Sequence, residues 1–439
     1  MPSLPPNKNK LGLWTSTSLV IGNMIGAGVF LMPSAMASFG SISLLGWVFA
    51  AIGAYFLARV FSNLSKLLPQ VSGGPYAYTR SGFGDFAGFL VAWCYWIAVS
   101  CANAAITISL VSALTAFVPA LGSSATASII TGLAAIWLLT WINTRGIIVS
   151  GKLQLATTAL KILPLLVVAV GGLFFIRFDN FLPFNNSGTS IPTAINATVT
   201  LAMFAFVGIE SAAIPAADVE DADKTVSKAT VIGLGIATLI YLLGSISIMG
   251  VIPVQKLAQS ATPYADAAEI MFGNSARYWV SAGIAIAAFG SLNGWILIQG
   301  QIPRSIAKDN LFPAIFAREN KRDVPYVGMV INSVMVSVFM AMNYTKGLVE
   351  QFKFLMLLSI FTVFVSYLLT MASYVIIRAK QNIKTGWTGA VVLAILAFAY
   401  CLWGIIGAGE LTVFYGFLFM AAGIPVYVWI RLVNKNINQ

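Results

Sequence analysis

Long apolar segments, separated by short polar or Gly/Pro-containing breaks, run through almost the whole chain. Hydrophobic residues make up 59% of its 439 residues and charged residues only 9%, whereas an ordinary soluble domain carries about 25% charged residues. A helix needs about 20 consecutive apolar residues to cross a bilayer. The sequence therefore predicts an all-α polytopic membrane protein, with 12 transmembrane helices in a single domain over residues 1–439. Their expected bounds are 11–39, 41–66, 86–118, 124–143, 153–176, 191–216, 226–253, 276–303, 325–343, 350–377, 386–407 and 411–433.

The distribution of basic residues predicts the orientation in the membrane. Lys8 and Lys10 precede the first segment without a convincing small-residue cleavage site, so we expect that segment to stay as a span. An even number of spans puts both termini on one side. With the termini in the cytoplasm, 18 of the 25 Lys and Arg residues lie in inside loops and tails and 5 in outside loops. This bias predicts a cell-membrane protein with cytoplasmic termini, and it explains the net charge of +11 without a nucleic-acid partner.

Several kinds of chemistry find no support in the sequence. The chain has no histidine, and Cys94, Cys101 and Cys401 lie in apolar segments without metal-site spacing, where we interpret them as small core residues. A phosphate-binding glycine-rich loop with its lysine is also missing from the sequence. We therefore expect no enzyme activity, no metal, no cofactor and no ATP-driven transport. Any proton coupling has to use a carboxylate, a lysine or a tyrosine.

A glycine cluster interrupts the first apolar segment. The stretch 22–30 reads GNMIGAGVF, with three glycines within seven residues, and each glycine weakens a helix by roughly 1 kcal/mol relative to alanine. Close helix packing through small residues is one interpretation. The other is an unwound segment whose free main-chain amides bind a carboxylate.

A second interruption favours the unwound segment. The sixth apolar segment contains AFVGIES at 205–211. Paired interruptions five segments apart are typical of inverted-repeat transporters, whose substrate site lies between the two breaks. The expected repeats are 11–176 and 191–377, followed by two extra helices at 386–433.

Glu210 is the one carboxylate that falls within the body of a predicted span. A charge near the bilayer centre costs several kcal/mol by insertion scales, roughly 2.5–3.5 kcal/mol. Such a carboxylate is either a proton-coupling or gating group, or a structural group held neutral by hydrogen bonds.

Lys161 is the second anomaly, in the fifth segment about two turns from its expected cytoplasmic end. It either extends to the membrane interface or supplies a fixed cation or proton site. Arg59 also lies within a span, but it is close enough to the cytoplasmic headgroups to reach them.

Five motifs carry a resemblance to a known family: GNMIGAGVF (22–30), SGGPYAY (72–78), FVGIESA (206–212), FGSLNGW (289–295) and LFPAIFA (311–317). With them the chain resembles, essentially end to end, the basic amino acid and polyamine antiporter branch of the amino acid–polyamine–organocation superfamily. The resemblance implies a five-plus-five inverted repeat with discontinuous helices 1 and 6. It also implies small amino acid and amine substrates, and a homodimer in the lipid bilayer.

The resemblance also implies the residues of the site. Main-chain amides at Ile25, Gly26, Ala27 and Gly28 would hold the substrate carboxylate, and Val207 and Ile209 would accept from its amino group. Asn103 and Ser359 match residues that bind a guanidinium group, and Trp295 matches the ring that stacks on it. The other implied pocket residues are Ala98, Phe204 and Phe352, and the implied gating residues are Glu210, Tyr95 and Tyr367. Without the resemblance, such aromatic and polar side chains fit helix packing equally well.

Three positions depart from the branch. Ala27 replaces a serine near the carboxylate site, and Phe204 replaces a tryptophan that covers the substrate. Lys161 instead resembles the lysine of proton-coupled or facilitative amino acid transporters in the same superfamily.

The sequence thus predicts a secondary transporter that exchanges a cationic amino acid, arginine-like or ornithine-like, for an amine such as agmatine or putrescine. The alternative is a proton-coupled symporter or uniporter of neutral amino acids that uses Lys161 and Glu210. A channel or a structural membrane protein is a third hypothesis, which two isolated broken helices do not favour.

Overall fold

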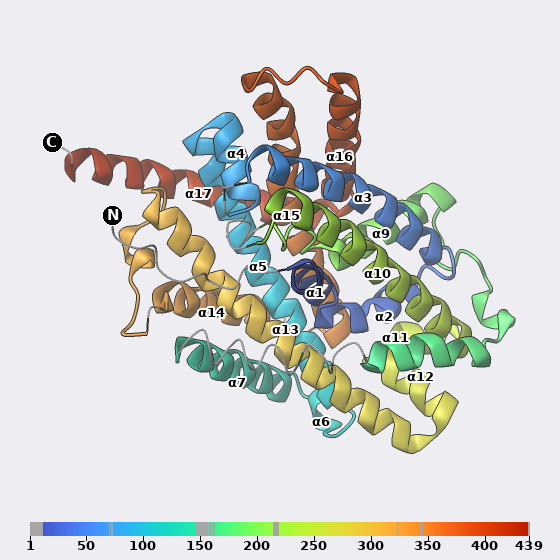
Figure 1. Ribbon diagram of the computed structural model, residues 1–439. Helices are drawn as coiled ribbons and strands as arrows, with labels where there is room; N and C mark the ends of the chain where they lie inside the picture. Colours follow the sequence, from blue (N-terminus) through green and yellow to red (C-terminus); the bar gives the residue numbers. More distant parts are fainter. Residues whose placement is uncertain are drawn as a thin grey trace.

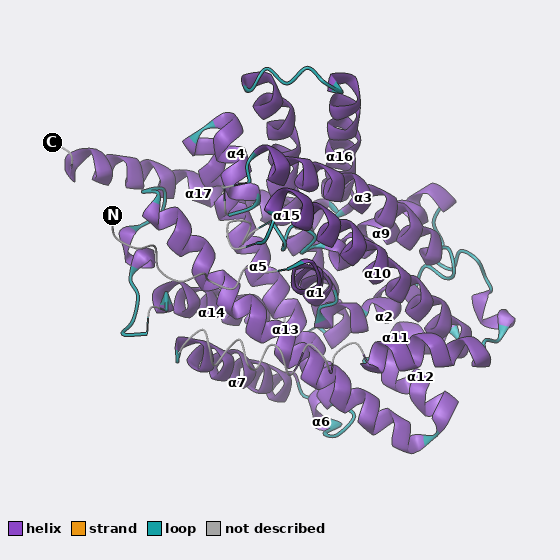
Figure 2. Ribbon diagram, in the orientation of Figure 1, coloured by secondary structure: helices purple, strands orange, loops and turns teal. Residues whose placement is uncertain are grey.

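The computed structural model describes residues 12–69, 71, 73–145, 157, 160, 163–213, 219–322, 324–342 and 346–437, except for the side chains of 19, 27, 28 and 434–437. Every regular element in this part of the chain is a helix (Figure 2). This agrees with the all-α class predicted from the apolar segments.

Eight of the described helices are long and apolar enough to cross a membrane. They are α3 (Ser43–Leu67), α5 (Asp85–Leu114), α7 (Ala125–Thr144), α10 (Ala222–Val251), α13 (Asn274–Lys308), α15 (Leu348–Lys380), α16 (Trp387–Gly407) and α17 (Glu410–Ile437). Three shorter apolar helices cover Leu163–Phe175, Ile191–Phe206 and Tyr326–Ala341, the last being α14.

Each of these helices lies within, or overlaps, an apolar segment expected from the sequence. The segment expected at 153–176 lies partly outside the described residues, and so does Lys161. The sequence analysis did not predict the short helices between the long ones. They are α4 (Pro75–Phe83), α6 (Ala120–Ser123), α11 (Val254–Gln259) and α12 (Pro263–Phe272).

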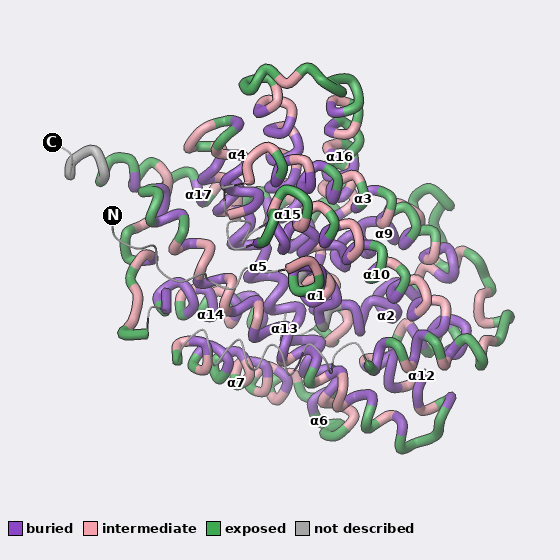
Figure 3. The backbone as a smooth tube through the Cα atoms, in the orientation of Figure 1, coloured by how far each residue is buried: buried purple, intermediate pink, exposed green. Residues whose placement is uncertain are grey.

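The outermost helices expose large apolar side chains. Trp137 on α7, Ile395 on α16 and Phe417 on α17 are all exposed, and Figure 3 shows that exposed backbone lies mainly at the periphery. Side chains of this kind are stable against lipid tails and costly against water. The exposed surface therefore fits a multi-pass membrane protein.

The centre of the molecule is formed by α1 (Leu13–Met24), α5, α10, α13 and α15. Figure 1 views α1 nearly end-on at this centre, where it contacts α10 and α13. Helix α5 is buried along almost its whole length. A polar group placed on α5 is therefore shielded from both lipid and water.

A cluster of charged residues joins the ends of four helices. Arg80 on α4 forms ion pairs with Asp85 at the start of α5 (2.9 Å) and with Asp309 just after α13 (2.8 Å), and Arg431 of α17 also pairs with Asp85. Tyr76 donates to Asp309 over 2.6 Å, and burial together with this carboxylate raises the pKa of Tyr76. Because the paired side chains are more than a third exposed, each pair contributes little stability, about 1 kcal/mol or less.

Candidate functional site

The first apolar segment is interrupted within its glycine-rich stretch, residues 22–30. Helix α1 ends at Met24, Ile25 leaves the helical conformation (φ −76°, ψ 65°), and the Gly26 amide donates to the Met24 carbonyl over 2.7 Å. A 3₁₀ turn, η1 (Ala27–Phe30), and a short helix, α2 (Met32–Ala37), complete the segment. The glycine-rich stretch therefore forms a non-helical connection between two helical pieces.

The second interruption follows α9 (Ile191–Met203). A 3₁₀ turn, η4 (Phe204–Phe206), leads into turns as far as Ala213. Gly208 adopts φ +102°, a left-handed value that glycine reaches without strain. The break in the apolar segment predicted at 191–216 therefore also lacks regular α-helix.

The two interruptions touch each other. A Cβ atom added at Gly208 would lie 3.3 Å from the Cβ atom of Asn23, at the end of α1. Asn23 also donates from Nδ2 to the hydroxyl of Ser211 over 2.8 Å. Segments almost 190 residues apart in sequence thus meet through a close backbone approach and a hydrogen bond.

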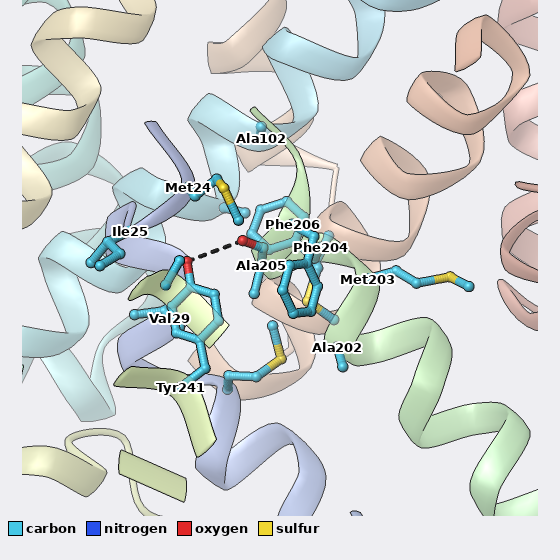
Figure 4. Close-up of a cluster of buried hydrophobic side chains, with 14 of the residues drawn as sticks. Met24, Ile25, Val29, Ala102, Ala202, Met203, Phe204, Ala205, Phe206 and Tyr241 are labelled. Atoms are coloured by element: carbon cyan, nitrogen blue, oxygen red, sulfur yellow. Dashed lines mark hydrogen bonds between the residues drawn. The ribbon is translucent and has the colours of Figure 1, made fainter. Parts of the chain in front are cut away.

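Neighbouring helices stabilise the second interruption. The Tyr241 hydroxyl on α10 donates over 3.0 Å to the carbonyl oxygen of Ala205, which has left the helical pattern, as the dashed line in Figure 4 shows. The Trp47 ring on α3 lies 6.2 Å from the Phe206 ring and 5.2 Å from the Tyr241 ring. In hydrocarbon an unpaired carbonyl is costly, so the Tyr241 hydroxyl makes the interruption tolerable at this depth.

A cavity of about 30 Å³ lies where the interruptions meet. Four predicted site residues, Gly26, Phe204, Val207 and Trp295, line it. The sequence analysis missed the remaining lining residues, Asn23, Met24, Val29, Ala102, Ala205 and Ile106, although most of them are neighbours of the two breaks or one turn apart on α5.

The cavity is small and its lining is uncharged. Its volume corresponds to about one water molecule, whereas pockets for small molecules usually reach about 300 Å³ or more. None of its described lining residues carries a charge. In this conformation the cavity is too small for an organic molecule, which can enter only if the surrounding helices move apart.

Other predicted site residues surround the cavity without lining it. Ile25 and Ile209 are buried. The Ser359 hydroxyl on α15 donates to the Ala98 carbonyl on α5 over 2.9 Å, and the Phe352 ring packs edge-on against Phe204 with 6.1 Å between centroids. The backbone of Ala27 and Gly28 belongs to η1, but the Ala27 side chain lies outside the described part of the structure.

The three predicted gating residues form one cluster. Glu210 is fully buried, and its two carboxylate oxygens accept from the hydroxyls of Tyr95 on α5 and Tyr367 on α15. Among the buried residues that the structure describes, Glu210 is the only one with an ionisable acidic or basic side chain other than Cys and Tyr. Because Ser211 is the next residue, the same turn is bound to α5 and α15 at Glu210 and to α1 at Ser211.

Asn103 lies just behind the cavity wall. Its side chain is fully buried and donates from Nδ2 to Gln299 of α13, a residue that the sequence analysis did not select. The neighbouring Ala102, and Ile106 one turn further along α5, line the cavity itself.

The chain is similar to known proteins along almost its whole length. The amino acid permease family matches residues 11–429 of the chain. The chain is 32% identical to a putative arginine/ornithine antiporter of Bacillus subtilis (strain 168), over 96% of this chain and 97% of the relative. It is 30% identical to an arginine/ornithine antiporter of Pseudomonas aeruginosa (92% and 87% covered) and 33% identical to a cadaverine/lysine antiporter of Escherichia coli (strain K12) (75% and 74% covered). The chain therefore belongs to the amino acid permease family, in its branch of basic amino acid and polyamine antiporters.

Proposed function

We propose that the protein is a secondary active antiporter that exchanges a cationic amino acid, arginine-like or ornithine-like, for an amine such as agmatine or putrescine. The observation that carries this proposal is the contact between two interrupted crossings at an uncharged cavity. Main-chain groups at such breaks, once they exchange their present partners, can bind a zwitterion without a charged side chain. The relatives named as arginine/ornithine and cadaverine/lysine antiporters support the substrate class.

The substrate contacts follow from this arrangement. Amides around Ile25–Gly28 bind the carboxylate, and carbonyls near Val207 and Ile209 accept from the α-amino group. The indole of Trp295 faces the distal cation, an interaction worth about 0.5–2 kcal/mol. Phe204, supported by Phe352, covers the substrate.

Glu210 couples exchange to pH in this proposal. An ionised carboxylate accepts from both Tyr95 and Tyr367, whereas a protonated one has a hydroxyl that must itself donate. Protonation therefore weakens the connection of the interrupted sixth crossing to α5 and α15, and this change favours opening of the site.

The membrane arrangement is part of the same proposal. Twelve spans form a five-plus-five inverted repeat with two additional C-terminal helices, both termini lie in the cytoplasm, and the protein is a homodimer in the cytoplasmic membrane. The bias of Lys and Arg between alternate loops supports this orientation.

Counterflow in proteoliposomes tests the function. Vesicles loaded with unlabelled ornithine, agmatine or putrescine are expected to accumulate labelled arginine, and empty vesicles are not. Uptake of a labelled neutral amino acid into empty vesicles, inhibited by alanine or leucine but not by arginine, would contradict the proposal. It would support a carrier of neutral amino acids. Uptake that the internal substrate does not accelerate would indicate a channel.

A further inference from the structure

Behind the cavity wall, a network of buried polar side chains connects four helices that lie together in Figure 1: α5, α7, α13 and α14. Its centre is Gln299 on α13, whose side chain is fully buried. Oε1 of Gln299 accepts from Nδ2 of Asn103 on α5 and from Nδ2 of Asn332 on α14. Nε2 of Gln299 lies 3.4 Å from the Ser333 hydroxyl, which in turn is 2.6 Å from the Thr140 hydroxyl on α7.

These contacts fix the orientation of the Gln299 amide. Two N–H donors face Oε1, and one hydroxyl oxygen faces Nε2. The Thr140 hydroxyl already donates to the Ile136 carbonyl over 2.7 Å, so the Ser333 hydroxyl donates to Thr140 and its oxygen is left to accept from Nε2 of Gln299. The Gln299 oxygen is therefore held toward α5.

The orientation of Gln299 decides which atom of Asn103 remains available. Nδ2 of Asn103 is used by Gln299, and Oδ1 has no hydrogen-bond partner among the described residues although it is buried. An unsatisfied buried acceptor costs about 1–3 kcal/mol. Turning Asn103 round to use Oδ1 would set two amide oxygens against each other at Gln299. Gln299 thus engages the Nδ2 end of Asn103 and leaves its Oδ1 as a free acceptor.

Both residues are adjacent to the substrate cavity. Gln299 follows Trp295 by one turn on α13, and Asn103 lies between Ala102 and Ile106 on α5. Trp295, Ala102 and Ile106 all line the cavity. When the site expands to admit a substrate, Oδ1 of Asn103 is an unsatisfied buried acceptor on the α5 side of the cavity.

We propose that Gln299 is a specificity-determining positioning residue, which holds Asn103 with its acceptor free and so selects substrates whose far end carries N–H donors over substrates whose far end is apolar. This inference rests on the proposed exchange of cationic substrates and adds the residue that sets the polarity of the distal subsite. A neutral acceptor also permits release, because it binds an ammonium or guanidinium group less tightly than a buried carboxylate does.

The test measures selectivity with two ligands of the same carbon skeleton. Ornithine ends in an ammonium group, and norvaline ends in a methyl group. Each competes with labelled arginine for uptake into proteoliposomes that contain wild type, Gln299→Met or Gln299→Glu. Ligand-induced shifts of the melting temperature of the purified proteins give a second measure, which does not require transport.

The three proteins are expected to differ in their preference for ornithine. Gln299→Met keeps the side-chain length but cannot accept from Asn103, so the preference should fall about tenfold, the effect of one hydrogen bond to a charged group. Gln299→Glu keeps the acceptor and should retain the preference. The matched control is Thr140→Val, which removes a hydroxyl from the same network without touching Asn103, and it should also retain the preference.

Each outcome decides between the alternatives. An unchanged ornithine preference in Gln299→Met, or a lost preference in Gln299→Glu, would overturn the role of Gln299. If Gln299→Met does not fold, Gln299→Leu, which also cannot accept from Asn103, takes its place. An equal loss in Thr140→Val would show that the network has only a structural role. A wild-type protein that prefers norvaline would instead contradict the proposed function.

Discussion

At the residue scale, the clearest feature is a carboxylate that receives two phenolic hydroxyls inside the protein. Tyr95 and Tyr367 come from different helices, and Glu210 lies in a non-helical turn between them. A buried group with both oxygens satisfied is stable as it stands, but it has to exchange a partner when its protonation changes. Glu210 is therefore suited to respond to pH through local hydrogen bonding.

Replacing Glu210 with Gln should flatten the pH profile of exchange. The amide has nearly the size of the carboxylate but does not ionise, so we expect exchange rates that change little from acidic to neutral pH while substrate binding stays measurable. Proteoliposome exchange over a pH series measures this. The control is Glu269→Gln, which removes a carboxylate that pairs with Arg277 (3.0 Å) outside the Glu210 cluster and should keep the wild-type pH profile. A Glu210→Gln variant with the full wild-type pH profile would rule out this role.

Replacing Trp295 with Leu should weaken binding of cationic substrates. The indole face is lost, and with it about 1 kcal/mol, which corresponds to roughly a fivefold lower affinity. Affinity is measured by competition or by ligand-induced stabilisation. Trp279→Leu on the same helix is the matched control, because Trp279 is 46% exposed at the periphery. Equal affinities for Trp295→Leu and wild type would remove this ring from the substrate contacts.

At the scale of elements, two interrupted crossings are held together at defined points. The backbone of the second interruption approaches Asn23 at Gly208, and Ser211 accepts from the Asn23 side chain. Tyr241 satisfies the Ala205 carbonyl from α10. These contacts replace the helical hydrogen bonds that the interruptions lose.

A methyl group at Gly208 should separate the two interruptions. Gly208→Ala introduces a left-handed alanine, which costs about 1–2 kcal/mol, and a Cβ atom 3.3 Å from Asn23. We expect a lower melting temperature and slower exchange. Gly84→Ala is the control, because Gly84 has a similar φ of +90° but no atom within 4 Å of an added Cβ. If Gly208→Ala and Gly84→Ala show equal melting temperatures and equal exchange rates, the close approach at Gly208 is not required for exchange.

At the scale of the whole molecule, large apolar side chains are exposed on the outer helices, and the polar side chains of the Glu210 cluster and the Gln299 network are buried. Buried backbone lies mainly at the centre of the molecule (Figure 3). The ion-paired cluster around Arg80 joins α4, α5, α17 and the end of α13. Since Arg80 and Arg431 lie in segments assigned to the inside by the basic-residue bias, this cluster should face the cytoplasm.

Single introduced cysteines test that orientation. Cys94, Cys101 and Cys401 are buried, so background labelling should be low. Lys256→Cys, at an exposed outside position, should react with a membrane-impermeant maleimide in intact cells, whereas Lys321→Cys should react only after permeabilisation. The reverse pattern would contradict cytoplasmic termini.

The helical class, most helix positions, the two interruptions and the family could all be inferred from the amino-acid sequence. Apolar length and glycine content act locally along the chain, so they can be read without coordinates. Glu210 stood out for the same reason, since a carboxylate within an apolar segment is costly wherever its partners lie.

Which side chains meet could be seen only in the folded protein. The pairing of Glu210 with Tyr95 and Tyr367, the bond from Asn23 to Ser211, and the network around Gln299 all join residues more than 100 positions apart or on different helices. A glutamine in a span has no distinctive local pattern, and the direction of its amide depends on donors supplied by two other helices, α5 and α14. The small volume of the cavity likewise depends on how the helices pack together, which no single segment specifies.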